Sequence, residues 1–412
     1  MNLRCVIAMA IAGLCVTLPV GAASHAADPT WGAAWYSPPF PPTSNLIYND
    51  VRVFSHQTVR QVVRLEASGN RVRLRLTNEM GLSSVKFGAV HIAMSSPNGV
   101  TEEKTDKKVL FGGKPDGEIK LGEALVSDPV EFKVKAHQLV AVSVYYPGRL
   151  SPSGHLVSLR LSKPGDHSAE TVMPFVDINR APSILSGIDV ESPEPRSVLV
   201  AFGDSITEGA CSTPGWNKSW PQQLAVRLLK SRLGASWTII NAGISGNRLL
   251  YEGAGQKALD RFDRDVLSIA GLRSVVLLEG INDIGAGSTV DSDTGPRTVD
   301  DIIGAYKQLI DRTHARGIKI YGGTLTPYAG AVYFSAQGEA VRTAVNAWIK
   351  TSSAFDGVID FDAATRDPEM PSHLIGAYQC GDNLHPNDAG YAAMADAVDL
   401  DLVTGSKSKK AR

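Results

Sequence analysis

Two kinds of hydrophobic pattern divide the chain. In its first half, short segments mix β-branched with polar residues, and residues 71–76 alternate strictly between apolar and polar. A period of two is typical of strands with one buried face. Similar segments recur between Gly, Pro and Asp clusters, at residues 58–65, 85–94, 129–134, 139–146 and 155–161. We predict an antiparallel β-sandwich of jelly-roll type over residues 28–190, with a hairpin loop at residues 68–70.

The pattern changes after a linker at residues 191–196, which is rich in Pro and Glu. Beyond it, continuous apolar runs alternate with amphipathic stretches, of which the clearest covers residues 302–310 and stops at Gly317. Such runs are typical of parallel strands that are buried on both faces. They cover residues 198–202, 237–240, 275–278, 318–321 and 358–361. We therefore predict a three-layer α/β domain with a parallel sheet over residues 197–404.

The ends of the chain fit neither pattern. A basic residue, an apolar run over residues 6–20 and small residues up to Ala26 predict a signal peptide at residues 1–26. The alternative is a membrane anchor, but the run is shorter than the roughly 20 residues that span a bilayer. Residues 405–412 are a basic tail. We expect an exported protein, periplasmic or extracellular, without stable membrane insertion.

Composition narrows the classes of partner. The 412 residues carry a formal net charge of −1, which gives no reason to expect a nucleic acid or a strongly charged partner. Carboxylates and histidines are present without the H-E-x-x-H spacing of a metal site, so we expect no metal and no cofactor. Nothing in the sequence defines the oligomeric state.

Candidate chemistry begins at Ser205. The chain lacks the G-x-S-x-G elbow of α/β-hydrolases, but a Gly-Asp-Ser segment follows the first buried strand. Open α/β sheets place their sites at this edge. Near the C-terminus, Asp382 and His385 are three residues apart, so the carboxylate can orient the imidazole toward a serine. His373 lacks such a neighbour. Asp204 is expected to be structural.

Four segments, taken in order, resemble the blocks of the SGNH (GDSL) hydrolase family. They are Gly203-Asp204-Ser205, Asn241-Ala242-Gly243-Ile244-Ser245-Gly246, Gly280-Ile281-Asn282-Asp283 and Asp382-Asn383-Leu384-His385-Pro386. The resemblance implies a flavodoxin-like fold and a triad of Ser205, Asp382 and His385. It also implies oxyanion donors at the Ser205 and Gly246 backbone N–H groups and the Asn282 side chain. The first half of the chain resembles the leader domain of xylan-associated acylhydrolases.

These features predict an exported serine ester hydrolase that acts on a small-molecule or polysaccharide ester. We favour a carbohydrate O-acetyl ester, partly because the loop at residues 285–296 is polar. A lipase or aryl esterase is the alternative, and residues 326–334 suit either pocket. A binding or adhesive protein on a degenerate hydrolase is the alternative from another class. Trp216 and Trp220 are expected to pack in the core or at a helix entry rather than to form a sugar platform.

Two cysteines remain after the signal peptide. Cys211 lies six residues after Ser205, and Cys380 lies two before Asp382. If the serine and His385 are within hydrogen-bond reach, the two cysteine loops must lie close together. Export supplies an oxidising compartment. We therefore predict a Cys211–Cys380 disulfide, with two unpaired thiols as the alternative.

Overall fold

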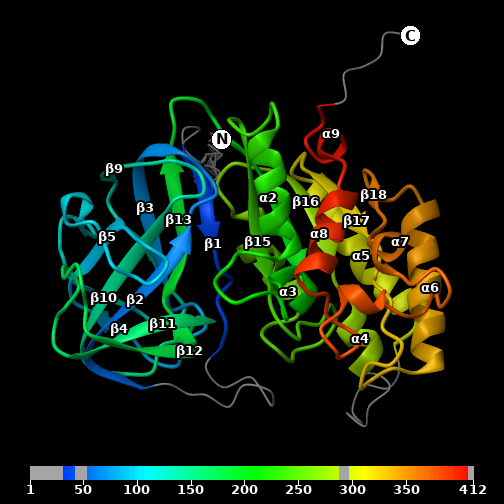
Figure 1. Cartoon of the computed structure of the whole chain (residues 1–412), viewed down its shortest axis with the longest axis horizontal. Coiled ribbons are helices and arrows are strands. Elements are labelled where there is room, and N and C mark those ends of the chain that lie inside the picture. The colour runs from blue at the N-terminus through cyan, green and yellow to red at the C-terminus, as the bar shows by residue number, and fades with distance from the viewer. Residues whose placement is uncertain (1–30, 42–52, 287–296, 407–412) are drawn as a thin grey trace, which may run out of the picture.

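The computed structural model describes residues 31–41, 53–286 and 297–406, which form two lobes side by side (Figure 1). The predicted signal peptide, most of the basic tail and most of the polar loop at residues 285–296 lie outside the described residues. Among the described residues, no helix combines the length and the apolar character that crossing a membrane requires.

The first lobe is an antiparallel β-sandwich, as predicted. One sheet has the strand order β1-β13-β3-β8, with β9 also paired to β3, and the other has the order β12-β11-β2-β10-β5-β6. Their apolar faces share one hydrophobic core. The strands are β1 (Trp31–Tyr36), β2 (Phe54–Arg64), β3 (Gly69–Thr77), β5 (Val90–Met94), β6 (Lys107–Val109), β8 (Ala124–Val126), β9 (Val130–Val134), β10 (Leu139–Leu150), β11 (His155–Pro164), β12 (Phe175–Ser183) and β13 (Leu185–Glu191), and a separate pair joins β4 (Val85–Phe87) to β7 (Gly117–Ile119).

The predicted hairpin at residues 68–70 is wrong. Strands β2 and β3 lie in opposite sheets, so the segment between them crosses the sandwich instead of turning back. Leu65 and Ala67 on this segment are fully buried. The Leu65 N–H donates to the carbonyl of Gln138 at 3.0 Å. Alternation gives each strand a buried face, but it does not say which sheet the strand joins.

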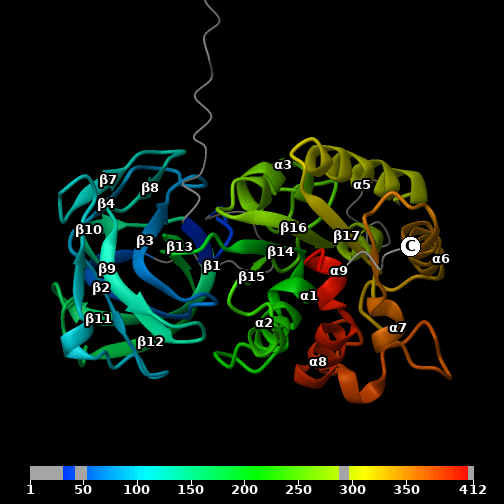
Figure 2. The ribbon, with the colours of Figure 1, turned by 90° about the horizontal axis from the view of Figure 1, so that it is seen from above.

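The second lobe is a parallel sheet with helices on both faces, with α3 and α5 on one side and α2 and α8 on the other (Figure 2). The strand order β15-β14-β16-β17-β18 places the second strand at the edge beside the first, which is the flavodoxin-like order. The strands are β14 (Ser197–Gly203), β15 (Trp237–Gly243), β16 (Leu272–Leu278), β17 (Lys319–Gly323) and β18 (Val358–Ile359). The helices are α1 (Ser205–Glu208), α2 (Trp220–Lys230), α3 (Ala258–Phe262), α4 (Ile281–Ala286), α5 (Val299–His314), α6 (Ala336–Thr351), α7 (Phe361–Thr365), α8 (Asp388–Ala397) and α9 (Leu400–Val403).

Helix α5 illustrates how the sequence specifies these layers. Thr298 and Asp301 form a reciprocal capping box at its start, which satisfies backbone N–H groups that have no acceptor within the helix. Ile302, Tyr306 and Leu309 form its buried face, as their spacing predicted.

Strand β1 belongs to both lobes. It pairs with β13 at the edge of the sandwich, and Ala34 packs in the sandwich core. Ala33 and Tyr36 instead pack in the core of the α/β lobe. The Ala33 N–H donates to the carbonyl of Ala270 at 3.1 Å, and the Tyr36 hydroxyl donates to Asp265 at 2.9 Å. The two cores therefore meet along this strand.

Candidate active site

Ser205 stands at the carboxyl edge of the parallel sheet, where β14 ends and α1 begins. The preceding Asp204 caps α1, because its side chain accepts a hydrogen bond from the Ile206 N–H at 2.9 Å. Gly203 is required for space: a Cβ there would lie 2.2 Å from the carbonyl oxygen of Leu278. The turn thus presents Ser205 beside the neighbouring strand, with 5 % of its surface exposed.

The structure brings Ser205 together with both C-terminal candidates. His385 Nε2 lies 2.8 Å from Ser205 Oγ, and His385 Nδ1 lies 2.6 Å from Asp382 Oδ2. The other oxygen of Asp382 accepts the backbone N–H groups of Leu384 and His385 at 3.0 and 2.9 Å. Partial burial opposes ionisation of Asp382, but the imidazole and these N–H groups outweigh it and hold its pKa well below its usual range.

An ionised Asp382 fixes the tautomer of the imidazole. The carboxylate accepts only, so Nδ1 of His385 carries the proton and donates it. Nε2 is then left with a lone pair, which accepts the hydrogen bond from the Ser205 hydroxyl. This arrangement can remove the serine proton, as general-base activation requires. The other candidate, His373, contacts Ser372 Oγ at 3.2 Å.

Residues 201–393 match the model of the GDSL-like lipase/acylhydrolase family. These residues form a GDSL-like lipase/acylhydrolase domain. A comparison with curated proteins found no match. Solved structures similar to the chain include a GDSL-like lipase from Bacteroides thetaiotaomicron, with 20% identity and a TM-score of 0.38 over 51% of this chain and 89% of that one. A catalytic mutant of an acetylxylan esterase from Geobacillus stearothermophilus has 20% identity and a TM-score of 0.39, over 49% of this chain and 91% of that one.

The turn after β15 holds the predicted oxyanion donor Gly246 in the GDSL-like domain. The Asn247 N–H donates to the carbonyl of Ile244 at 3.0 Å, and Gly246 has a φ of 74°. A glycine adopts this left-handed conformation without steric cost. The sequence motif therefore ends in glycine because the turn requires it.

Asn282 is the residue whose side chain is predicted to donate to the oxyanion, and two contacts hold it. Its Oδ1 accepts from the Tyr333 hydroxyl at 3.2 Å, and its Nδ2 donates to the carbonyl of Asn247 at 2.9 Å. A primary amide has two N–H groups. Among the described residues only one N–H of Asn282 has an acceptor, so the other is left for a further one. Of residues 326–334, Tyr333 reaches the site, whereas Tyr328 is fully buried.

Sequence reasoning missed the network behind these donors. Arg261 is fully buried and donates to Asn247 Oδ1 at 2.8 Å and to the carbonyls of Ala242 and Gly203 at 2.9 Å. It thus joins the ends of the strands that lead to Ser205 and Gly246. The only sequence signal was an arginine on the face of a short amphipathic helix, which is usually a surface position.

Buried carboxyl groups surround this network. Burial raises the pKa of Asp204 to about 7 and that of Asp283 to about 6. It also raises the pKa of Glu279, which lies 3.7 Å from Arg261. Asp283 accepts the N–H groups of Leu249 and Leu250 at 2.6 and 2.9 Å, so it anchors the loop that follows the Gly246 turn.

The C-terminal segment is fastened to the loop after Ser205 by a disulfide and by hydrogen bonds. Cys211 and Cys380 form a disulfide, as predicted, with their Cα atoms 6.1 Å apart. The Thr213 hydroxyl donates to Asp388 at 2.7 Å, and the Tyr391 hydroxyl donates to the carbonyl of Ala210 at 2.7 Å. The two sulfurs also lie within 4.8 Å of an Asp382 oxygen, but they are bonded to each other and do not offer thiolates to a metal.

Proposed function

We propose that the GDSL-like domain is a serine ester hydrolase that works through an acyl-enzyme. The observation that carries this proposal is the unbroken run of hydrogen bonds from Ser205 through His385 to Asp382, at 2.8 and 2.6 Å. Ser205 Oγ attacks the ester carbonyl carbon while His385 Nε2 takes its proton. The C–O bond to the alcohol then breaks, and the alcohol leaves with that proton.

Water completes the cycle. His385 takes a proton from water as the hydroxide attacks the acyl carbon, and Ser205 leaves with the proton when the acid is released. In both steps, negative charge develops on the carbonyl oxygen. The donors would be the Asn282 amide and the backbone N–H groups of Ser205 and Gly246. The N–H of Ser205 stands in the first turn of α1, where helix N–H groups have no acceptor within the helix.

A small acyl group is the better fit to the side chains beside Ser205. The ring of Tyr333 packs against Gly285, where a Cβ would lie 2.3 Å from the ring. Its hydroxyl also contacts Asn282. A bulky, fixed side chain beside an oxyanion donor limits the room for an acyl chain. We propose a carbohydrate O-acetyl ester as the substrate and an exported location, which the disulfide supports because disulfides persist in oxidising compartments.

Hydrolysis of p-nitrophenyl acetate tests the reaction. We expect turnover by the wild type and a loss of about 10⁴–10⁶-fold in kcat for Ser205→Ala, as when a triad nucleophile is removed. Ser236→Ala is the matched control, since this serine is exposed and donates to the carbonyl of Leu233. Wild-type rates in the Ser205→Ala protein would overturn the assignment. Absence of turnover by the wild type would favour a binding protein.

A panel of p-nitrophenyl esters from acetate to palmitate, with acetylated polysaccharides, tests the substrate. We expect kcat/KM to fall as the acyl chain lengthens. A maximum at long chains would favour a lipase.

A further inference from the structure

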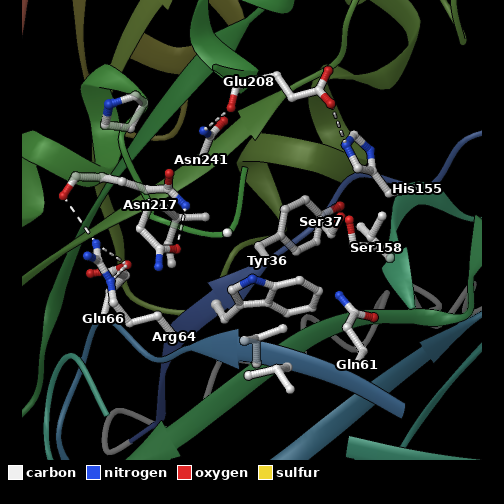
Figure 3. Close-up of a pocket in the computed structure, with 18 of the residues that line it drawn as sticks. Tyr36, Ser37, Gln61, Arg64, Glu66, His155, Ser158, Glu208, Asn217 and Asn241 are labelled. Atoms are coloured by element: carbon white, nitrogen blue, oxygen red, sulfur yellow. Dashed lines mark hydrogen bonds and ion pairs between the residues drawn. The ribbon is translucent and has the colours of Figure 1, made fainter. Parts of the chain in front are cut away.

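A cavity of about 680 Å³ lies between the sandwich and the GDSL-like domain (Figure 3). Its walls come from β1, β2 and β11 on one side and from α1, α2, β15 and the loop before α2 on the other. The volume lies within the range of about 300–1,000 Å³ that is typical of small-ligand sites. The lining residues do not include Ser205, Asp382 or His385. This cavity is therefore a separate space from the triad.

An exposed tryptophan stands at the cavity. Trp216 is 70% exposed, which contradicts the expectation that it packs in the core or at a helix entry, whereas Trp220 is fully buried as expected. Trp35 and Tyr36 add two more aromatic rings to the lining. The face of an aromatic ring carries partial negative charge, so it attracts the weakly positive C–H groups on the face of a sugar ring.

Two side-chain amides with fixed orientations line opposite sides of the cavity. Gln61 is 95% buried, and its Oε1 accepts from the Ser183 hydroxyl at 2.6 Å, which fixes the orientation of the amide. Within the described part of the chain, no group accepts a hydrogen bond from its Nε2. Asn217 accepts from Gln222 at 3.1 Å through Oδ1, which orients its NH₂ group in the same way. Figure 3 shows Gln61 and Asn217 on opposite sides of the space.

Four of the charged or titratable side chains of the cavity form two pairs, and Arg160 instead donates to the carbonyl of Pro97 at 3.1 Å. Arg64 and Glu66 form an ion pair at 2.8 Å, and His155 lies 3.3 Å from Glu208. Figure 3 shows these two pairs at opposite corners of the site. Burying a charged ligand against paired charges would leave it without a counter-charge. Aromatic faces, oriented amides, two charge pairs and an arginine that already donates to a backbone carbonyl suit an uncharged polyhydroxylated ligand.

We propose that this cavity binds a neutral oligosaccharide and holds the glycan part of the ester substrate. The second half of this statement rests on the proposed hydrolase function. Glu208 lines the cavity and ends the helix that Ser205 begins, three residues or about 4.5 Å along the axis. The cavity therefore reaches the helix of the nucleophile without including it, as a subsite for sugar units beyond the acylated one requires.

Calorimetric titration of the full chain with xylohexaose, cellohexaose and mannohexaose, all unacylated, tests the binding. We expect at least one to bind the wild type, and Trp216→Ala and Gln61→Ala each to weaken that binding at least tenfold. Leu82→Ala is the matched control, because Leu82 has the same 70% exposure in the sandwich and does not line the cavity. Thermal unfolding of each variant separates loss of binding from loss of fold.

The outcomes separate this proposal from the hydrolase function. Unacylated sugars need no turnover, so binding with no p-nitrophenyl acetate hydrolysis would uphold the cavity as a saccharide site and reject the esterase. Hydrolysis without binding of any of the three hexasaccharides would overturn the cavity proposal alone. Unchanged affinity in a folded Trp216→Ala protein would overturn it as well.

Discussion

Each lobe buries an arginine completely, and the two arginines have different surroundings. Arg60 in the sandwich donates to Ser143 and to the carbonyls of Gly99 and Glu170 at 2.6–3.0 Å. Arg261 in the GDSL-like domain also donates to carbonyls, but it lies among buried carboxyl groups such as Glu279. The first arginine ties strands and loops of the sandwich together. The second stands directly behind the residues around Ser205.

Strand direction explains the contrast. Parallel strands all end at the same edge, so β14, β15 and β16 deliver Ser205, Gly246 and Asn282 to one place. Antiparallel neighbours end at opposite edges, so the sandwich does not concentrate strand ends in this way. The sandwich instead contributes one wall of the cavity between the two lobes. We therefore expect changes at the parallel edge to affect turnover most.

The largest effect expected beyond the nucleophile is that of Asn282→Ala. Removing one oxyanion donor costs about 10²–10³ in kcat, with little change in KM because the charge develops only in the transition state. Tyr333→Phe keeps the ring and deletes only the hydroxyl that orients the amide, so we expect a smaller loss in kcat. Steady-state kinetics on p-nitrophenyl acetate measure both.

Asn70→Ala in the sandwich is the control for this pair, since Asn70 is an exposed asparagine of β3. We expect its kcat to match the wild type. If Asn282→Ala changed KM and left kcat intact, the side chain would bind substrate rather than stabilise the oxyanion.

The disulfide should have the next largest effect. It fastens the loop after Ser205 to the segment that carries Asp382 and His385. Small displacements of catalytic groups lower turnover steeply, so we expect about a tenfold loss in kcat for the Cys211→Ser, Cys380→Ser double variant. Loop-closure entropy sets an upper limit of about 5 kcal/mol on the loss of stability.

Reducing the wild type below its unfolding temperature should lower activity in parallel, while circular dichroism stays unchanged. Activity that falls only when the protein unfolds would show that the disulfide acts on the fold as a whole.

The difference between the parallel sheet and the antiparallel sandwich also determines how much could be predicted from the sequence. Ser205 and Asn282 each follow their own apolar strand, so the strand pattern and the motif located them together. The segment around Gly69 is not the predicted hairpin, because sheet membership depends on pairing partners far along the chain. Tyr333 and Arg261 act through tertiary contacts with residues 51 and 14 positions away. No local pattern encodes such contacts.

The sandwich should also have a small effect on kcat, through a side chain that contacts the GDSL-like domain. His155 on β11 contacts one oxygen of Glu208, and the other oxygen accepts the N–H of Ser245, next to Gly246. This links the sandwich to the turn after β15 that holds Gly246. A partly exposed pair contributes at most about 1 kcal/mol, so we expect His155→Ala to lower kcat by no more than about fivefold.

His167→Ala is the matched control, because His167 pairs with Glu170 at 2.7 Å within the sandwich. Equal kinetics for the two variants would mean that the sandwich affects binding alone. A loss in His155→Ala that a higher substrate concentration restores would mean that the residue acts on substrate binding rather than on turnover.

The smallest effect concerns stability rather than turnover, and it tests the buried carboxyl groups that set the two lobes apart. Burial raises the pKa of Asp204 to about 7 in the folded chain, above its ordinary value of 3.8. Between these two values the folded state binds more protons than the unfolded state, so this residue makes stability fall as pH rises from about 4 to 7. Asp204→Asn keeps the oxygen that caps α1 and carries no charge at any pH. We therefore expect the melting temperature of the variant, relative to the wild type, to be higher at pH 8 than at pH 5, with a difference of a few degrees.

Glu279 and Asp283 lie in the same buried cluster and still titrate in the variant, so part of the dependence of stability on pH should remain. Calorimetry from pH 5 to 8 measures the two curves, and parallel curves would mean that Asp204 already folds with its charge compensated.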